Sequence, residues 1–190
     1  IAMLICEENN FVDCIRNVHK NVRGSCTLLI LTNGGIYVAR DRYGRTPIVI
    51  GTKKNAYAAS SESSVFPNLG FETEYYVGPS EIVHMSPEGY RQASPPGDRM
   101  QVCAFLWVYY GYPPSCYEGI NVEEVRYKCG RALARDDTVE ADLVSGIPDS
   151  GIGHAIGYAI GKGIPYMRPY VKYTPTWPRS FMPQNQAIRD

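Results

Sequence analysis

The stretch Ala141-Asp-Leu-Val-Ser-Gly-Ile147, followed by the turn Pro148-Asp-Ser-Gly151, decides the fold of the second half of the chain. An apolar strand pattern leads here into a tight loop, and a helix of small residues is predicted over 152–160. A second strand is predicted from Ile164 onward. Strand, loop, helix and strand form a βαβ unit, which predicts a parallel α/β sheet.

The first half of the chain shows the pattern of antiparallel strands behind one leading helix. Asn10 is a suitable N-cap for an amphipathic helix that would run up to Gly24. The dipeptide Asn33-Gly34, between the apolar runs 27–32 and 35–39, predicts a β-hairpin. The chain as a whole is therefore predicted to be α+β and then α/β. Further short strands are predicted at 48–50, 57–59, 81–85 and 90–92.

A stretch rich in proline, glycine and serine, Ala93-Ser-Pro-Pro-Gly-Asp98, separates the two patterns. We place a domain boundary there, with one domain over 1–95 and another over 96–190. Beyond the boundary, Asn121 is expected to cap a helix that begins with Val122.

Composition excludes several classes of protein. Nineteen Lys and Arg balance nineteen Asp and Glu, so the chain lacks the basic field that dominates nucleic-acid binding. No apolar run approaches the ~20 residues of a membrane-spanning helix, and the start of the chain does not resemble a secretory signal. Six cysteines without Cys-x-x-Cys spacing are expected to be reduced thiols, which predicts a cytoplasmic protein.

The loop Pro148–Gly151 is the candidate ligand site. Ligands of open α/β sheets bind beyond the carboxyl ends of the strands, and this loop also begins a helix whose N–H groups favour an anion. Asp149 or the Ser150 hydroxyl could meet a metal ion. The alternative is a helix cap without any ligand, since Asp and Ser are the commonest N-cap residues.

The segment Tyr170–Pro183 is polar, aromatic and rich in proline. Lys172 and Arg179 could clamp a phosphate, the arginine through two parallel hydrogen bonds. The alternative is an ordered surface loop in which a cation packs on Trp177.

The charged turn Arg40–Pro47 has a different expected role. Asp41 can accept hydrogen bonds from the backbone and from arginine around Gly44, so we expect this turn to be structural.

Six motifs, taken in order, resemble a known enzyme family. The first three resemble the later part of a class II glutamine amidotransferase domain, and the other three resemble the start of a type I phosphoribosyltransferase domain. Joined in this order, they resemble the amidophosphoribosyltransferases over essentially the whole chain. The motifs are Arg40–Pro47, Ala59–Ser63, Val77–Ile82, Cys103–Tyr110, Ile147–Gly151 and Lys172–Pro183.

The resemblance implies both a fold and a reaction. The fold would be the C-terminal part of an N-terminal-nucleophile (αββα) glutaminase domain, joined to the first βαβ part of a phosphoribosyltransferase domain. Enzymes of this family release ammonia from glutamine and use it to displace pyrophosphate from phosphoribosylpyrophosphate (PRPP), with Mg²⁺, in the first committed step of purine synthesis. Glutamine and PRPP would be the small-molecule partners, and relatives assemble as homo-oligomers.

The resemblance also implies roles for single residues. Ser150 corresponds by motif position to a Mg²⁺-site residue, in a loop with Asp149 that faces the substrate. Lys172, Tyr173 and Arg179 would belong to the flexible loop that closes over PRPP. A further motif residue, Cys103, matches the first of four cysteines that hold a [4Fe–4S] cluster in part of the family.

The sequence departs from the family at both ends. The family nucleophile is a cysteine at the mature N-terminus, where this sequence has Ile1. Cys6 cannot replace that nucleophile because the mechanism uses the free α-amino group beside the thiol. The acidic PRPP signature would lie beyond Asp190. No residue is therefore assigned a catalytic role, and the 190-residue chain alone is expected to be inactive. The alternative is a non-catalytic, truncated relative that binds a ribose phosphate or a partner subunit.

Overall fold

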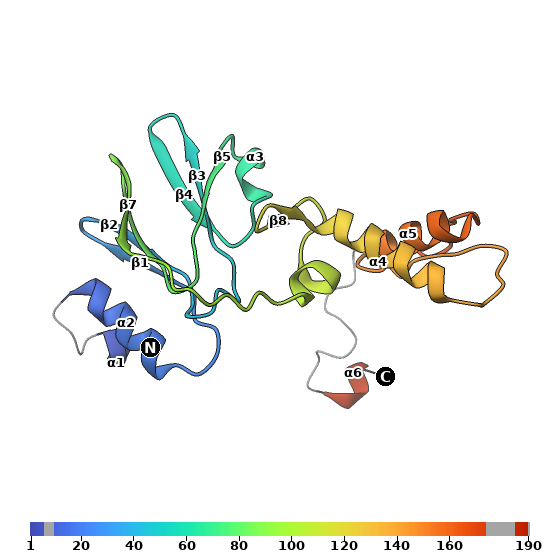
Figure 1. The fold of residues 1–190 in the computed structure, drawn as a ribbon, viewed down its shortest axis with the longest axis horizontal. Helices are drawn as coiled ribbons and strands as arrows, with labels where there is room; N and C mark the ends of the chain where they lie inside the picture. The colour runs from blue at the N-terminus through green and yellow to red at the C-terminus, as the bar shows by residue number, and fades with distance from the viewer. Residues whose placement is uncertain (6–9, 174–184, 190) are drawn as a thin grey trace. The chain divides into compact units, whose positions relative to one another are not determined.

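The computed structural model describes residues 1–5, 10–173 and 185–189, and it contains both helices and strands (Figure 1). The chain divides into two compact units, Ile1–Val125 and Arg126–Asp190. The predicted family-domain boundary after residue 95 falls inside the first unit. It stays a prediction, because a compact unit need not coincide with a family domain.

The chain begins with two helices, α1 (Ala2–Ile5) and α2 (Phe11–Asn21). Asn10 caps α2 as predicted, and its side chain accepts a hydrogen bond of 2.9 Å from the backbone N–H of Asp13. The helix ends earlier than the expected Gly24, because the backbone of Val22 is already extended.

A four-stranded antiparallel sheet follows, in the order β1-β2-β6-β7. The predicted hairpin at Asn33-Gly34 is confirmed, since Thr32 and Gly35 face each other across the turn. The predicted strands at 81–85 and 90–92 are also confirmed, each with slightly different ends. The four strands are β1 (Leu28–Thr32), β2 (Gly35–Ala39), β6 (Ile82–Ser86) and β7 (Gly89–Ser94).

A second antiparallel sheet has the order β4-β3-β5. Strands β3 (Val49–Lys53) and β4 (Ala56–Ser60), which correspond to the short strands predicted at 48–50 and 57–59, pair as a hairpin. Strand β5 (Glu72–Tyr76) was not predicted, and it follows the short helix α3 (Val65–Asn68). Gly51 lets the Phe66 ring approach β3, because a Cβ at this glycine would lie 2.7 Å from the ring.

The first unit is built in three layers. The two sheets enclose a core that includes Val38, Ile50 and Val83. Ile15 of α2 packs with Ala39 and Ile82 on the other face of the four-stranded sheet. Val38 and Ala39 are neighbours in β2 and therefore face opposite sides. The sheet thus lies between α2 and the second sheet, as Figure 1 shows.

Beyond the sheets, a short π-helix, η1 (Leu106–Tyr110), precedes the strands β8 (Cys116–Tyr117) and β9 (Ile120–Asn121). Helix α4 (Val122–Asp136) then begins in the first unit and continues into the second. Asn121 caps it as predicted, with its Oδ1 accepting a hydrogen bond of 3.0 Å from Glu124 N.

The second unit is organised around α4 and α5 (Ile152–Lys162), and its last described helix is α6 (Gln186–Arg189). Helices α4 and α5 touch through glycines, because a Cβ at Gly130 would lie 2.0 Å from His154 O and one at Gly157 would lie 2.2 Å from Tyr127 O. The glycines of α4 and α5 therefore let the two helices pack closely against each other.

The predicted βαβ unit is present in reduced form. Val144 and Tyr166, on either side of α5, form one parallel bridge. The strands predicted at 141–147 and from Ile164 onward shrink to this bridge within the described residues. The parallel direction is as predicted, and the extent of the strands is not.

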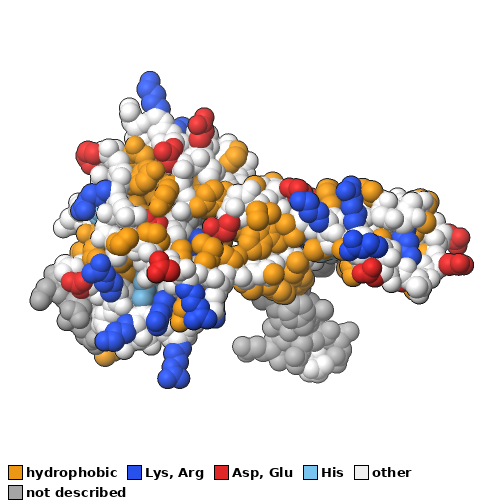
Figure 2. Space-filling model, viewed as in Figure 1, with side chains coloured by type: hydrophobic (Ala, Val, Ile, Leu, Met, Phe, Trp, Pro, Cys, Tyr) orange, Lys and Arg blue, Asp and Glu red, His pale blue; other side chains and the backbone are white. Residues whose placement is uncertain are grey.

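In the described parts of the chain, none of the helices has the length and apolar character required to cross a membrane. Figure 2 shows basic and acidic side chains interspersed on the visible face, in keeping with the balanced charge of the sequence.

Candidate functional site

The candidate loop Pro148–Gly151 leads directly into α5. The backbone N–H of Gly151 donates to Ile147 O over 3.0 Å, and Ile152 N donates to Asp149 O over 3.3 Å. Gly151 is the N-cap residue, and no side chain caps the helix. The alternative to a ligand site was that the side chain of Asp149 or Ser150 caps the helix. The structure shows no such cap.

Two glycines make this loop compact. A Cβ at Gly146 would lie 2.8 Å from Gly151 O, and a Cβ at Gly151 would lie 2.8 Å from Ile147 O. Any larger residue would push the loop away from the helix start. The loop backbone thus lies close against the first turn of α5.

Two of the predicted site residues meet in the second unit. Lys172 Nζ lies 3.4 Å from Asp149 Oδ2, and the two side chains are 47% and 60% exposed. An ion pair this exposed contributes little to stability. Tyr173 is 68% exposed, and Ser150 is half-buried in the loop. Arg179, predicted for the same clamp, lies outside the described residues, as does Trp177.

The resemblance implies two inorganic groups, Mg²⁺ and a [4Fe–4S] cluster, and the oxygen atoms of this loop suit Mg²⁺. Magnesium prefers oxygen ligands and commonly takes one or two carboxylates together with substrate phosphates, and Asp149 and Ser150 offer such oxygens. A [4Fe–4S] cluster needs four cysteines. Cys103 is free and exposed, and the described residues contain no group of three or more His, Cys, Asp or Glu that could hold a metal. These residues alone therefore do not hold a cluster.

The cysteines of the described residues form no disulfide with one another. They are Cys14, Cys26, Cys103, Cys116 and Cys129. Cys6 lies outside the described residues.

In the first unit, Asp41 organises the charged turn as expected. Its carboxylate accepts hydrogen bonds from the backbone N–H groups of Thr46, Arg45 and Tyr43, at 2.8, 3.1 and 3.1 Å. Burial by itself raises the pKa of Asp41, but these hydrogen bonds to the charged form outweigh it, so the net pKa lies below the ordinary 3.8. The pKa of the buried His19 is lowered, because burial penalises its charged form more than the nearby Asp41 favours it.

A second buried carboxylate belongs to Glu81, which is 0% exposed. It accepts hydrogen bonds from the Tyr75 hydroxyl at 2.8 Å and from Gly78 N at 2.6 Å. Burial of Tyr75, together with this carboxylate, raises the pKa of Tyr75 to about 12. Both groups stabilise the fold around β5 and β6.

Sequence reasoning missed a network around Glu62, in the Ala59–Ser63 motif. The Tyr117 hydroxyl donates to Glu62 Oε1 over 2.6 Å, and the Ser115 hydroxyl donates to Glu62 Oε2. Ser115 and Tyr117 are 0% and 1% exposed. The run of hydroxyl and carboxyl side chains at 60–64 was the available signal, but its partners lie more than 50 residues away.

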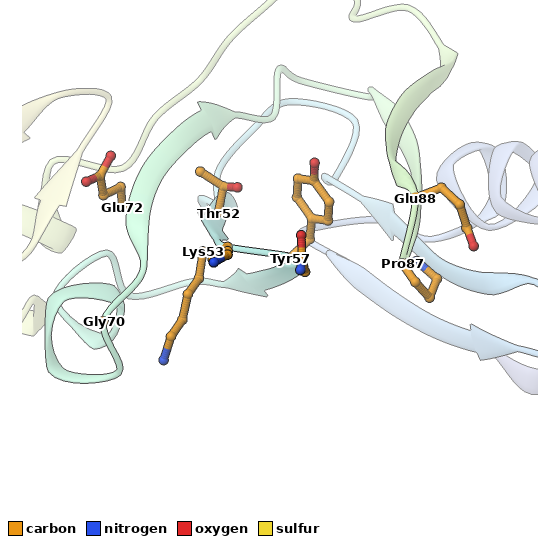
Figure 3. Close-up of a pocket in the computed structure, with 9 residues that line it drawn as sticks. Thr52, Lys53, Tyr57, Gly70, Glu72, Pro87 and Glu88 are labelled. Carbon is orange, nitrogen blue, oxygen red and sulfur yellow. The ribbon is translucent and has the colours of Figure 1, made fainter.

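The first unit also has a cavity of about 590 Å³ beside the β3–β4 turn. Figure 3 shows its labelled side chains spread around the rim, with Lys53 and Tyr57 pointing in different directions. Ligand sites have polar groups that converge, so this cavity has little of their character. None of the predicted site residues lines it. Its lining residues are Thr52, Lys53, Lys54, Asn55, Tyr57, Gly70, Glu72, Pro87 and Glu88.

The chain was compared with known proteins in three ways. No family model matches it. It is 36% identical over 167 residues to the amidophosphoribosyltransferase of Methanothermobacter thermautotrophicus, covering 87% of this chain and 35% of that one. It is 34% identical over 193 residues to the Bacillus subtilis enzyme of the same name, covering 100% of this chain and 40% of that one.

Solved structures give the same result. The glutamine PRPP amidotransferase of B. subtilis, in complex with ADP and GMP, matches 99% of this chain and 42% of its own, with a TM-score of 0.84 and 34% identity. A structure described as the allosteric regulatory enzyme of purine biosynthesis matches with a TM-score of 0.81. The chain thus spans about two fifths of the length of the relatives that it matches.

Proposed function

The resemblance to amidophosphoribosyltransferases that the sequence predicts is confirmed in sequence and in fold, and from it we propose that this chain is a segment of such an enzyme. The observation that carries the proposal is the match along the whole chain, with a TM-score of 0.84 at 34% identity. The proposed reaction takes ammonia from glutamine and joins it to C1 of PRPP, and pyrophosphate leaves.

The proposed division of labour follows the predicted domains. Residues 1–95 would belong to the N-terminal-nucleophile glutaminase domain, and two stacked antiparallel sheets support this. Residues 96–190 would begin the phosphoribosyltransferase domain, and the parallel bridge between Val144 and Tyr166 supports a βαβ start. The residues that hydrolyse glutamine are to be sought in the complete protein.

The proposed PRPP site lies at the start of α5. The loop Pro148–Gly151 presents the helix N-terminus, which favours a phosphate group. Lys172 Nζ lies 3.4 Å from Asp149 Oδ2 at this loop. A phosphate bound at the helix N-terminus would therefore contact a cation that is already positioned. Tyr173 and Arg179 are proposed to close over the substrate with it.

In the transfer step, the lone pair of the ammonia nitrogen forms a bond to C1 of the ribose while the bond from C1 to the pyrophosphate oxygen breaks, and the new ammonium group then loses one proton to water. Negative charge grows on the pyrophosphate, and Lys172 and the helix N-terminus are placed to stabilise it. Asp149 and Ser150 would hold Mg²⁺, which neutralises charge on the leaving group when bound.

Two further properties are proposed with the reaction. Cytoplasmic location is supported by cysteines that form no disulfide with one another within the described residues. Assembly as a homo-oligomer rests on analogy with the family alone.

The test is turnover by the complete protein that carries this chain. With glutamine, PRPP and Mg²⁺, we expect release of both glutamate and pyrophosphate, and ammonium should replace glutamine in releasing pyrophosphate. The non-catalytic alternative predicts binding of PRPP without release of pyrophosphate from either nitrogen source. That result would overturn the proposal.

A further inference from the structure

The turn Ser115–Asn121, here called the junction turn, connects the sheets of the first unit to helix α4. It contains β8 and β9, which pair with each other, and α4 begins directly after it. It lies beyond the predicted domain boundary, so it belongs to the proposed transferase part. Its main hydrogen-bond partners belong to the proposed glutaminase part.

The first set of partners lies around Glu62. Both carboxylate oxygens accept hydrogen bonds from the junction turn, one from the Tyr117 hydroxyl at 2.6 Å and one from the Ser115 hydroxyl. The backbone N–H of Cys116 donates to Ser63 Oγ over 2.7 Å. Hydrogen bonds to a charged group are roughly twice as strong as neutral ones, and the two side chains that donate to Glu62 are buried.

The second partner is Arg40. Its Nη2 donates to Glu118 Oε1 over 2.6 Å. The same guanidinium donates to Val77 O at 2.7 Å and to Gly44 O at 2.6 Å. Because the backbone of the first part fixes the guanidinium, Arg40 presents a positioned cation to the junction turn.

The other side of the junction turn carries α4 and η1. Val122 N donates to Ser115 O over 3.0 Å, and Asn121 supplies the side-chain cap of α4. Trp107 of η1 donates from Nε1 to Ile120 O over 3.0 Å. Any movement of the junction turn therefore moves the start of α4 and the aromatic helix η1.

We propose that Glu62 is a positioning residue that couples glutamine hydrolysis to the use of the released ammonia. It acts through the junction turn, because the glutaminase part cannot shift relative to that turn without breaking the hydrogen bonds from the buried Ser115 and Tyr117 to Glu62. This inference rests on the proposed function.

The test uses the complete enzyme that carries this chain, with the substitution Glu62→Gln. The amide keeps the size of the carboxylate, but its NH₂ group then faces a hydroxyl that donated to an oxygen. We measure glutamate released per pyrophosphate released, and separately the ammonium-dependent release of pyrophosphate. The ratio should rise several-fold, within the roughly 5–150-fold range of couplings between sites, while the ammonium-dependent rate is retained.

Glu140→Gln is the matched control, since Glu140 is exposed in the loop after α4, and its ratio should equal that of the unmodified enzyme. An unchanged ratio in Glu62→Gln overturns the inference, and so does an equal loss of both rates at constant ratio, which indicates a purely structural role. If Glu62→Gln does not fold, Tyr117→Phe provides the test, with the exposed Tyr112→Phe as its control. An unmodified enzyme without turnover contradicts the proposed function instead.

Discussion

Arg40 and Glu118 form an ion pair of 2.6 Å between a guanidinium that is 1% exposed and a carboxylate that is 24% exposed. The two residues are 78 positions apart in sequence. The pair therefore joins two distant segments within the first unit. Because Arg40 also binds two backbone carbonyl groups, its loss affects more than the ion pair.

Arg40→Met should destabilise the chain by about 3–5 kcal/mol, because it leaves a largely buried carboxylate and two carbonyl groups without their donor. Glu118→Gln should cost less, about 1–3 kcal/mol, since Arg40 keeps its carbonyl partners. The urea midpoint at constant slope measures both. The control is Arg91→Met, an exposed position on β7, and an equal effect of Arg40→Met and Arg91→Met would contradict the structural role of Arg40.

Gly130→Ala should destabilise the second unit by about 3 kcal/mol, or more if the helices cannot separate. The added Cβ would lie 2.0 Å from His154 O, so α4 and α5 must move apart. Helix propensity predicts the opposite sign, a gain of about 1 kcal/mol. The free energy of unfolding decides between them, with Ala132→Gly at an exposed position of α4 as the control for propensity alone. A stabilised Gly130→Ala variant would show that the helices do not touch there.

His19→Leu should remove part of the pH dependence of stability. The folded-state pKa of His19 lies below 6.5 because of burial, so the unfolded chain takes up a proton first as the pH falls. Stability that is fully present above pH 6.5 is therefore lost as the pH falls from 6.5 through the folded-state pKa. The urea midpoints measured above and below pH 6.5 should differ less in His19→Leu than in the unmodified chain. An equal difference in the two proteins would contradict this prediction.

The pKa of Asp41 is also lowered, from an ordinary 3.8. Its contribution to stability is present above pH 3.8 and is lost as the pH falls further through its folded-state value. Asp41→Asn should therefore flatten the stability profile mainly in this more acidic range. A change confined to neutral pH would contradict the assignment.

Lys172→Met should weaken binding of pyrophosphate by about 10–150-fold, the loss expected for a hydrogen bond to a charged group of 1.5–3 kcal/mol. Folding should be unaffected, because the ion pair of Lys172 with Asp149 is exposed on both sides. Calorimetric titration with pyrophosphate and Mg²⁺ measures the change. The control is Lys54→Met, at the exposed β3–β4 turn. Equal affinities of the two variants for pyrophosphate would contradict the assignment of Lys172 to the site.

Local signals in the sequence were sufficient for much of the first unit. Asn10 and Asn121 cap helices as predicted, and Asn33-Gly34 closes the expected hairpin. Each of these features depends on residues within a few positions of one another. Strand β5 was missed because its first half, with Glu72 and Glu74, is exposed and lacks an apolar pattern.

The parts that the sequence could not predict depend on distant contacts. Nothing near Glu62 indicates that Ser115 and Tyr117 will donate to it, since more than 50 residues intervene. The strand predicted at 141–147 shrinks to one bridge at Val144, because an apolar run forms a strand only where a neighbour pairs with it. Of the candidate site, the sequence predicted Asp149 in the loop before α5 and Lys172 in a separate phosphate clamp with Arg179. The structure brings Lys172 within 3.4 Å of Asp149.

The central claim is that the complete protein moves nitrogen from glutamine to the ribose of PRPP. The most direct measurement supplies glutamine with an isotope-labelled amide nitrogen, together with PRPP and Mg²⁺, and follows the label by mass spectrometry. We predict that the label appears on the aminated ribose phosphate, with pyrophosphate released in equal amount. Release of labelled ammonia without labelled product, or no consumption of PRPP, would contradict the claim.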